Sequence, residues 1–212
     1  MKYRFGVFIL NINNFIKKII FYFAVGVGCF VFSYNIFATN SSNENGGQNL
    51  NENIEEKDWG KRMGTRKIVT DDMTVLRQKS KKVEIFDEKL NNFVLDMVQT
   101  LKEIENGVGL AAVQVGVLKQ VIVVDLKNDK DFFILINPKI VEASKEEEEG
   151  IEGCLSFPNK SGKVKRPKHI KVVAQDVKGK EIEIVADGFL ARVICHEVDH
   201  LEGKVFLDRV EK

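Results

Sequence analysis

The chain of 212 residues has three histidines, and two of them, His196 and His200, lie four residues apart in the segment HEVDH. In an α-helix, side chains four positions apart project from the same face, about 6 Å apart along the axis. Two such imidazoles can bind one metal ion, and Glu197 between them can act on a water molecule instead of on the metal. The alternative is an amphipathic helix with two ordinary surface histidines, since short patterns also arise by chance.

A catalytic metal site needs a third protein ligand and keeps one further position open. Cys154 is the strongest candidate, because its neighbour Gly153 leaves it accessible and a bound dication would keep its thiolate deprotonated. The alternative is a small, buried core residue. We expect that core role for Cys195, which is adjacent to His196 and so points about 100° away around the helix. We assign no role to His169.

The segment GVGLAAVQVG, residues 107–116, is rich in glycine but does not match a dinucleotide-binding fingerprint. It lacks the third glycine at the right spacing, and it follows an expected helix instead of a strand. As a loop, it would let the backbone approach a substrate closely. Gln114 could then donate an amide N–H to an oxygen that develops negative charge. The alternative is a tight turn between a helix and a strand, with Gln114 merely exposed.

The sequence divides into three parts. Residues 19–38 carry no charge and follow several basic residues, so residues 1–38 indicate a signal peptide or signal anchor, with a buried core helix as the alternative. Residues 39–62 are rich in Asn, Ser and Gly and are expected to be a disordered spacer. Residues 63–212 are expected to form one catalytic domain.

Within that domain, apolar spacing predicts a helix over residues 86–107, capped by Asp87 and ended by Gly107. Strands are expected at 120–126 and at 132–143, where Pro138 marks an edge or a bend. Residues 145–150, KEEEEG, are expected to be a solvated loop. A hairpin at 169–188 and a helix at 189–203, ended by Gly203, complete the pattern. These elements predict an α+β fold with mixed or antiparallel sheets packed around a C-terminal metal-binding helix.

Bulk composition narrows the function classes. The net charge is +1, so no overall field attracts nucleic acid or an anionic membrane. The three cysteines are widely spaced and odd in number, which does not suggest a disulfide framework. A free thiol that must stay reduced indicates a reducing compartment.

Three segments taken together resemble peptide deformylases: the glycine-rich segment from Gly107 to Gln114, EGCLS from Glu152 to Ser156, and HEVDH. They occur in the order typical of that family, and the resemblance extends from about Ile68 to the C-terminus. The family commonly has proline where this chain has Val113, a difference that concerns the rigidity of the loop more than the chemistry.

The resemblance implies hydrolysis of the formyl group from the N-formylmethionine of new polypeptides. It implies metal ligation by Cys154, His196 and His200, and acid/base catalysis by Glu197. It further implies stabilisation of the tetrahedral oxyanion by two donors, Gln114 and the backbone N–H of Leu155. Val108, Gly109 and Gly153 are expected to contact the substrate. The family uses Fe²⁺, and zinc, nickel or cobalt can occupy such a site; ligand chemistry alone favours zinc.

Two other functions remain open from the residues: a different metal hydrolase, such as a small peptidase, and a membrane-tethered domain with a purely structural metal site. The expected partners are formylmethionyl nascent peptides near the ribosome exit. Nucleic acid is not expected, and membrane contact is expected only if residues 19–38 are retained. We expect a bacterial cytoplasmic location and a start at Met63, with an organelle or a membrane anchor as the alternatives.

Overall fold

The computed structural model describes residues 64–128 and 131–210, so the predictions for residues 1–62 lie outside the described residues. The helices described are α2 (Met73–Leu76), α3 (Glu88–Glu103) and α4 (Gly188–Leu201), with 3₁₀ helices η1 (Ala112–Val115) and η2 (Phe206–Asp208). The strands are β1 (Gly109–Ala111), β2 (Val121–Asp125), β3 (Phe132–Ala143), β4 (Glu147–Cys154), β5 (Phe157–Pro167), β6 (His169–Gln175) and β7 (Glu181–Asp187). No helix in this part of the chain has both the length and the apolar character to span a bilayer.

The strands form two sheets. Five strands pair in the order β1-β2-β3-β6-β7, and β4 pairs with β5 in a separate two-stranded sheet. All these strand pairs are antiparallel, and a single isolated bridge between Lys81 and Lys119 is parallel. The predicted α+β class with antiparallel sheets is therefore confirmed.

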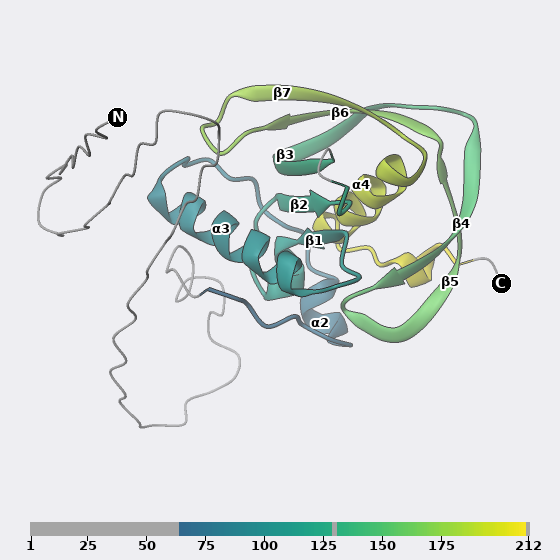
Figure 1. Ribbon diagram of the computed structural model, residues 1–212, viewed down its shortest axis with the longest axis horizontal. Helices are drawn as coiled ribbons and strands as arrows, with labels where there is room; N and C mark the ends of the chain where they lie inside the picture. Colours follow the sequence, from purple (N-terminus) through teal and green to yellow (C-terminus); the bar gives the residue numbers. More distant parts are fainter. Residues whose placement is uncertain (1–63, 129–130, 211–212) are drawn as a thin grey trace, which may run out of the picture. The chain divides into compact units, whose positions relative to one another are not determined.

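The five-stranded sheet is covered on both faces near β2 (Figure 1). Ile122 and Val124 belong to the apolar cluster that includes residues of α4, whereas Val121 and Val123 belong to the cluster that includes residues of α3. Successive strand residues point to opposite faces, so a strand covered on both sides must be apolar at nearly every position. The run VIVV in β2 meets this requirement.

The predicted helix after Asp87 is confirmed as α3. The Asp87 side chain accepts a hydrogen bond from the Leu90 backbone N–H at 3.1 Å, which satisfies one of the free donors of the first turn. The predicted end is wrong, however. The helix stops at Glu103, and Ile104 already has an extended backbone. Gly107, three positions further on, closes a separate turn through a hydrogen bond from its N–H to the Ile104 carbonyl.

The strand and hairpin predictions are confirmed for β2, β3, β6 and β7. Pro138 lies where the pairing of β3 with β6 changes register, as expected for a residue that has no backbone N–H. In the β6–β7 hairpin, Gly179 has a φ of 80° within the connecting turn. The last helix, α4, ends at Leu201, and Gly203 follows with a φ of 71°.

Two predicted loops are wrong, and both segments contribute to sheets. The acidic run at 145–150 is exposed, as expected, but Glu147–Glu149 begin β4 because they pair with residues 165–167 of β5. Opposite charges across the hairpin favour this pairing, and Lys163 Nζ lies 2.9 Å from Glu149 Oε1. Within 107–116, Gly109–Ala111 pair with β2, and the next residues form η1. The strand β5 has no counterpart in the sequence predictions.

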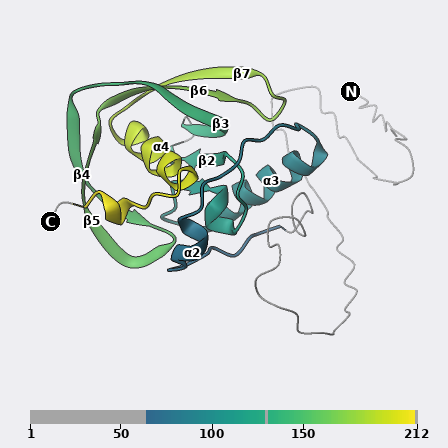
Figure 2. The ribbon, with the colours of Figure 1, turned by 180° about the vertical axis from the view of Figure 1, so that it is seen from behind.

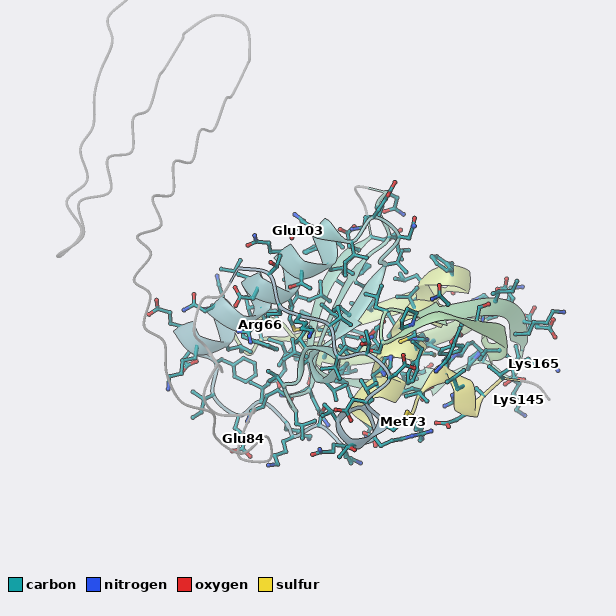
Figure 3. The ribbon with its side chains drawn as sticks, turned by 90° about the horizontal axis from the view of Figure 1, so that it is seen from below. Arg66, Met73, Glu84, Glu103, Lys145 and Lys165 are labelled. Atoms are coloured by element: carbon teal, nitrogen blue, oxygen red, sulfur yellow. The ribbon has the colours of Figure 1, made fainter. Side chains whose placement is uncertain are left out.

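Helix α4 lies between the five-stranded sheet and the β4–β5 hairpin, as Figures 1 and 2 both show. It is buried along most of its length and contacts strands of both sheets. On the opposite face of the main sheet, Arg66 lies beside α3 (Figure 3), where its guanidinium pairs with the buried Asp96.

Candidate metal centre

The structure brings the three predicted ligands together from two separate elements. Cys154 is the last residue of β4, and His196 and His200 lie one turn apart on α4. Cys154 Sγ lies 3.2 Å from His200 Nε2, and one ligand atom from each of the three residues lies within 4.8 Å of the other two. Such convergence brings the three donor atoms within reach of a single ion.

The donor set suits a transition-metal dication. One thiolate and two imidazoles are ligands for zinc, iron, nickel or cobalt, and are poor ligands for magnesium or calcium. No fourth Cys, His, Asp or Glu among the described residues joins the group. Three protein ligands with an open position are typical of a catalytic site, whereas structural sites usually have four.

Glu152 orients the first histidine. The His196 Nδ1–H donates to Glu152 Oε2 at 3.0 Å, so the opposite ring nitrogen faces Cys154. Burial alone would raise the pKa of Glu152, but hydrogen bonds from Arg166 and His196 lower it to about 2. A permanently charged carboxylate behind a ligating histidine holds the ring in place and makes it a better ligand.

The sequence interpretation missed this role of Glu152. A signal was available: residues two apart in a strand lie on the same face, so a strand that presents Cys154 to a metal also presents Glu152 to the same side. The strand itself was not predicted at that point, because its first half is a run of glutamates.

The two histidines have opposite pKa shifts. Burial lowers the pKa of His200 to about 3, which keeps its imidazole neutral, as a metal ligand must be. For His196, burial also acts to lower the pKa, but hydrogen bonds with Cys154 and Glu152 outweigh it and raise the pKa to about 10. A dication bound at this position must displace that proton.

Glu197 is buried beside the three candidate ligands. Its Oε2 atom has no hydrogen-bond partner, and burial raises its pKa to about 7. The backbone of β1 passes directly over this carboxyl group. A Cβ atom at Gly109 would lie 2.9 Å from Glu197 Cδ and closer still to Oε1, so only glycine leaves room at this position. A buried, unpaired carboxyl group next to three candidate metal ligands is an expected feature of a general acid or base.

Gln114 is buried, so the alternative in which it is merely exposed is wrong. Its Oε1 accepts a hydrogen bond from the Ala111 backbone N–H at 2.8 Å, which fixes the orientation of the amide. The Nε2 group consequently points to the ligand side, 3.5 Å from Cys154 Sγ and 3.3 Å from Ser156 Oγ. The amide N–H groups are thus aimed at the space next to the metal cluster.

A cavity of about 390 Å³ opens onto these groups. Its walls include all four of the remaining predicted site residues, Val108, Gly109, Gly153 and Leu155. Ile151 and Phe189, which the sequence interpretation did not select, also line it and remain largely exposed at its rim. An apolar rim around a polar centre is typical of a site that binds a peptide with an apolar side chain.

The residues expected to lie outside the site do so. Cys195 is buried in the apolar cluster between α4 and the main sheet, and burial raises its pKa to about 11. His169 is exposed on β6 and interacts with Asp187 at 2.5 Å.

Known proteins are similar to this chain over the part that contains these residues. The sequence profile of the family described as Polypeptide deformylase matches residues 65–212. The chain is 45% identical over 148 residues to peptide deformylase 2 of Clostridium acetobutylicum, covering 70% of this chain and 97% of that protein. It is 45% identical over 150 residues to peptide deformylase 1 of Bacillus subtilis, covering 71% and 92%.

Solved structures give the same result. The crystal structure of peptide deformylase from Thermotoga maritima is similar with a TM-score of 0.66 and 39% identity, covering 70% of this chain and 99% of that one. The structure of a peptide deformylase from Synechococcus elongatus in complex with actinonin is similar with a TM-score of 0.65 and 43% identity, covering 69% and 79%.

Proposed function

The chain belongs to the polypeptide deformylase family, and on this premise we propose a role for each group of the metal centre. The family removes the formyl group from the N-terminus of nascent polypeptides in a metal-dependent hydrolysis. This chain is therefore a metal-dependent hydrolase of linear formamides that acts on N-formylmethionyl peptides and releases formate. The observation that carries the assignment of roles is the convergence of Cys154 with His196 and His200 beside a buried, unpaired Glu197.

Cys154, His196 and His200 are proposed to hold the metal. A bound dication lowers the pKa of water and polarises a carbonyl group, which are the two things that hydrolysis of an unreactive formamide requires. The two sets of ligands would come from different elements, because β4 supplies the thiolate and α4 supplies the imidazoles.

Glu197 is the proposed acid/base. Its unpaired oxygen takes the proton of the attacking water and later returns it to the leaving amine. A pKa of about 7, raised by burial, suits both transfers, because the group then accepts and releases a proton with similar ease near neutral pH.

Gln114 and the Leu155 backbone N–H are the proposed oxyanion donors. The hydrogen bond from Ala111 fixes the Gln114 amide before substrate binds, so little reorganisation is needed when negative charge develops. Leu155 follows Cys154 directly in the turn between β4 and β5, and it lines the cavity. A single donor of this kind contributes about 2.7–4 kcal/mol to the lowering of the barrier.

The substrate backbone is proposed to lie along Val108, Gly109 and Gly153, which line the cavity beside the metal cluster. The small glycines allow the backbone of a peptide to approach the protein backbone. The methionine side chain would lie in the apolar part of the cavity.

The native metal is proposed to be Fe²⁺, with zinc, nickel or cobalt able to occupy the same donors. Metal analysis of protein purified without oxygen tests this proposal. An iron enzyme is expected to lose activity in air through oxidation of the metal and of the Cys154 thiolate. Indifference to air together with a full complement of zinc or nickel would contradict it.

Residues 63–212 are proposed as the catalytic domain. Residues 1–38 are proposed as a signal-like segment, which would contact a membrane only if residues 19–38 are retained, and residues 39–62 as a spacer. The site of action is proposed to be the bacterial cytoplasm near the ribosome exit, where formylated chains emerge. Fractionation of cells tests the location, since recovery of the protein only with membranes would contradict it.

The activity itself is tested by incubating the full chain with a formyl-Met peptide and measuring formate. Formate release with no cleavage of internal peptide bonds is expected. Cleavage of internal bonds without formate release would assign the site to a peptidase instead. A fully metal-loaded protein with neither activity would indicate a structural metal site.

A further inference from the structure

We propose that Arg209, near the end of the described chain, is a positioning residue for the metal ligand His196. It acts through a buried chain of ionised groups, namely Asp199, Arg166 and Glu152. The inference rests on the proposed function, because it takes His196 to be a ligand, and it concerns a residue well outside the substrate cavity.

The first link joins the C-terminal segment to α4. Arg209 Nε donates to Asp199 Oδ2 at 2.6 Å, and its Nη2 donates to Asp199 Oδ1 at 2.7 Å. This two-point contact fixes the plane of the carboxylate as well as its position. The Asp199 side chain is only 10% exposed, whereas that of Arg209 is 42% exposed, so the outer end of the chain reaches solvent.

The second link is an arginine shared by two carboxylates. Arg166 on β5 contacts Asp199 through Nη1, and it donates to both oxygens of Glu152 through Nε and Nη2, each at 2.9 Å. Its side chain is 3% exposed. The position of this guanidinium therefore depends on its attraction to two buried carboxylates, Asp199 and Glu152.

The third link reaches the metal ligand. Glu152 Oε2 accepts the His196 Nδ1–H at 3.0 Å, and Glu152 Oε1 also accepts from Arg192 at 3.1 Å. The geometry of the carboxylate sets the orientation of the imidazole. Outer partners of this kind typically change metal affinity about 10- to 100-fold when they are lost.

Arg209 affects how Arg166 divides its contacts between Asp199 and Glu152. With Arg209 in place, both oxygens of Asp199 have donors, and Arg166 is free to hold Glu152 at two points. Without it, a mostly buried carboxylate loses one of its cations, which is unfavourable unless the neighbours move. The nearest relief is a shift of Arg166 toward Asp199 and away from Glu152, which loosens the support of His196.

The chain offers a matched control in the preceding residue. Asp208 forms a two-point ion pair with Arg77, with Arg77 Nη2 2.7 Å from Asp208 Oδ1 and a second contact through Nη1. This pair also attaches the C-terminal segment to the domain, but both side chains are more than a third exposed. None of its hydrogen bonds leads to Glu152 or to His196.

The experiment compares the full chain with its R209Q and R77Q variants, each loaded with nickel or zinc. The rate of metal release to an excess of chelator is measured, together with the thermal midpoint of each protein. R209Q is expected to release metal about 3- to 10-fold faster than the wild type, less than the loss of a direct partner because the effect passes through Asp199 and Arg166. R77Q is expected to release metal at the wild-type rate, whatever its thermal midpoint.

Three results would overturn the proposal. A wild-type release rate in R209Q removes Arg209 from the chain of contacts. Equal acceleration in R209Q and R77Q indicates general loosening of the C-terminal segment. Should R209Q not fold, R209K keeps the charge but donates from one point, and a wild-type rate in R209K would then be the contradicting result. Metal release does not depend on deformylation, so failure of the proposed function would appear separately, as absence of formate release by the wild type.

Discussion

Helices α3 and α4 pack against opposite faces of the same strand, β2, but their buried polar groups differ in how fully they are hydrogen-bonded. On α3, Asp96 accepts from Arg66 Nε at 3.2 Å and from Nη2 at 3.0 Å, and Thr100 accepts from the Arg66 backbone N–H at 2.8 Å. On α4, by contrast, Glu197 Oε2 and His200 Nδ1 are buried without a hydrogen-bond partner.

This difference distinguishes buried polar groups that stabilise the fold from those that have another role. A buried polar group that is fully paired contributes to the stability of one packing arrangement, as Asp96 does by attaching the segment around Arg66 to α3. A buried group left unpaired is costly, and it persists where another role requires it. Both residues belong to the candidate metal centre: His200 presents its other ring nitrogen, Nε2, to Cys154, and Glu197 lines the same cavity as Cys154.

The largest expected effect is on activity, and it distinguishes two buried carboxylates, Glu197 on α4 and Asp96 on α3. Glu197→Gln keeps the shape of the side chain but cannot accept the proton of water, so kcat/KM for a formyl-Met peptide should fall about 10²- to 10⁴-fold. Metal content, measured by elemental analysis, should be unchanged. Asp96→Asn on α3 is the control and should retain kcat. Comparable losses of kcat in both variants would break the distinction between the helices.

The next effect concerns the two cysteines near α4. Cys154→Ser removes the thiolate from the metal centre and should weaken metal binding by at least the roughly 100-fold seen on loss of strong outer partners. Cys195→Ser changes a buried cysteine of the apolar cluster and should leave metal affinity unchanged. Titration with zinc or cobalt in competition with a chelator measures both. Unchanged affinity in Cys154→Ser would exclude that residue as a ligand.

The stability of α3 provides the third test. Asp96→Asn removes the carboxylate that pairs with the buried Arg66 guanidinium, so the free energy of unfolding should fall by about 3–5 kcal/mol. Denaturant unfolding of the metal-loaded protein measures this loss. A change below about 1 kcal/mol would show that the pair is not a structural element of this face.

The smallest expected change is the loss of stability on metal removal. Binding at a hundredfold excess over Kd stabilises the native state by about 2.7 kcal/mol, and chelation removes this contribution. Amide hydrogen exchange should then increase in the second half of α4 and around Cys154, while the amides of α3 remain protected. Equal loss of protection in α3 and α4 would mean that the two faces of the sheet unfold as one unit.

Much of the local structure could be predicted. Apolar spacing and the Asp87 cap predicted α3, and the alternation around Gly179 predicted the β6–β7 hairpin, because these signals depend on backbone geometry over a few residues. The glutamate run before Gly150 was wrongly predicted to be a loop, because such local signals do not report pairing with a distant strand. Its strand character comes from pairing with β5, and no property of the run itself indicates that pairing.

The sequence by itself determined that two imidazoles share one face of a helix with Glu197 between them, since 3.6 residues per turn leaves no other arrangement for that spacing. The order of three motifs also pointed to the family and to Cys154. Only the tertiary structure decided that the sulfur of Cys154 lies 3.2 Å from His200 and that Glu152, Arg166 and Asp199 stand behind the ligands. Those distances depend on how a hairpin docks on a helix, which is the sum of many contacts between residues far apart in the chain.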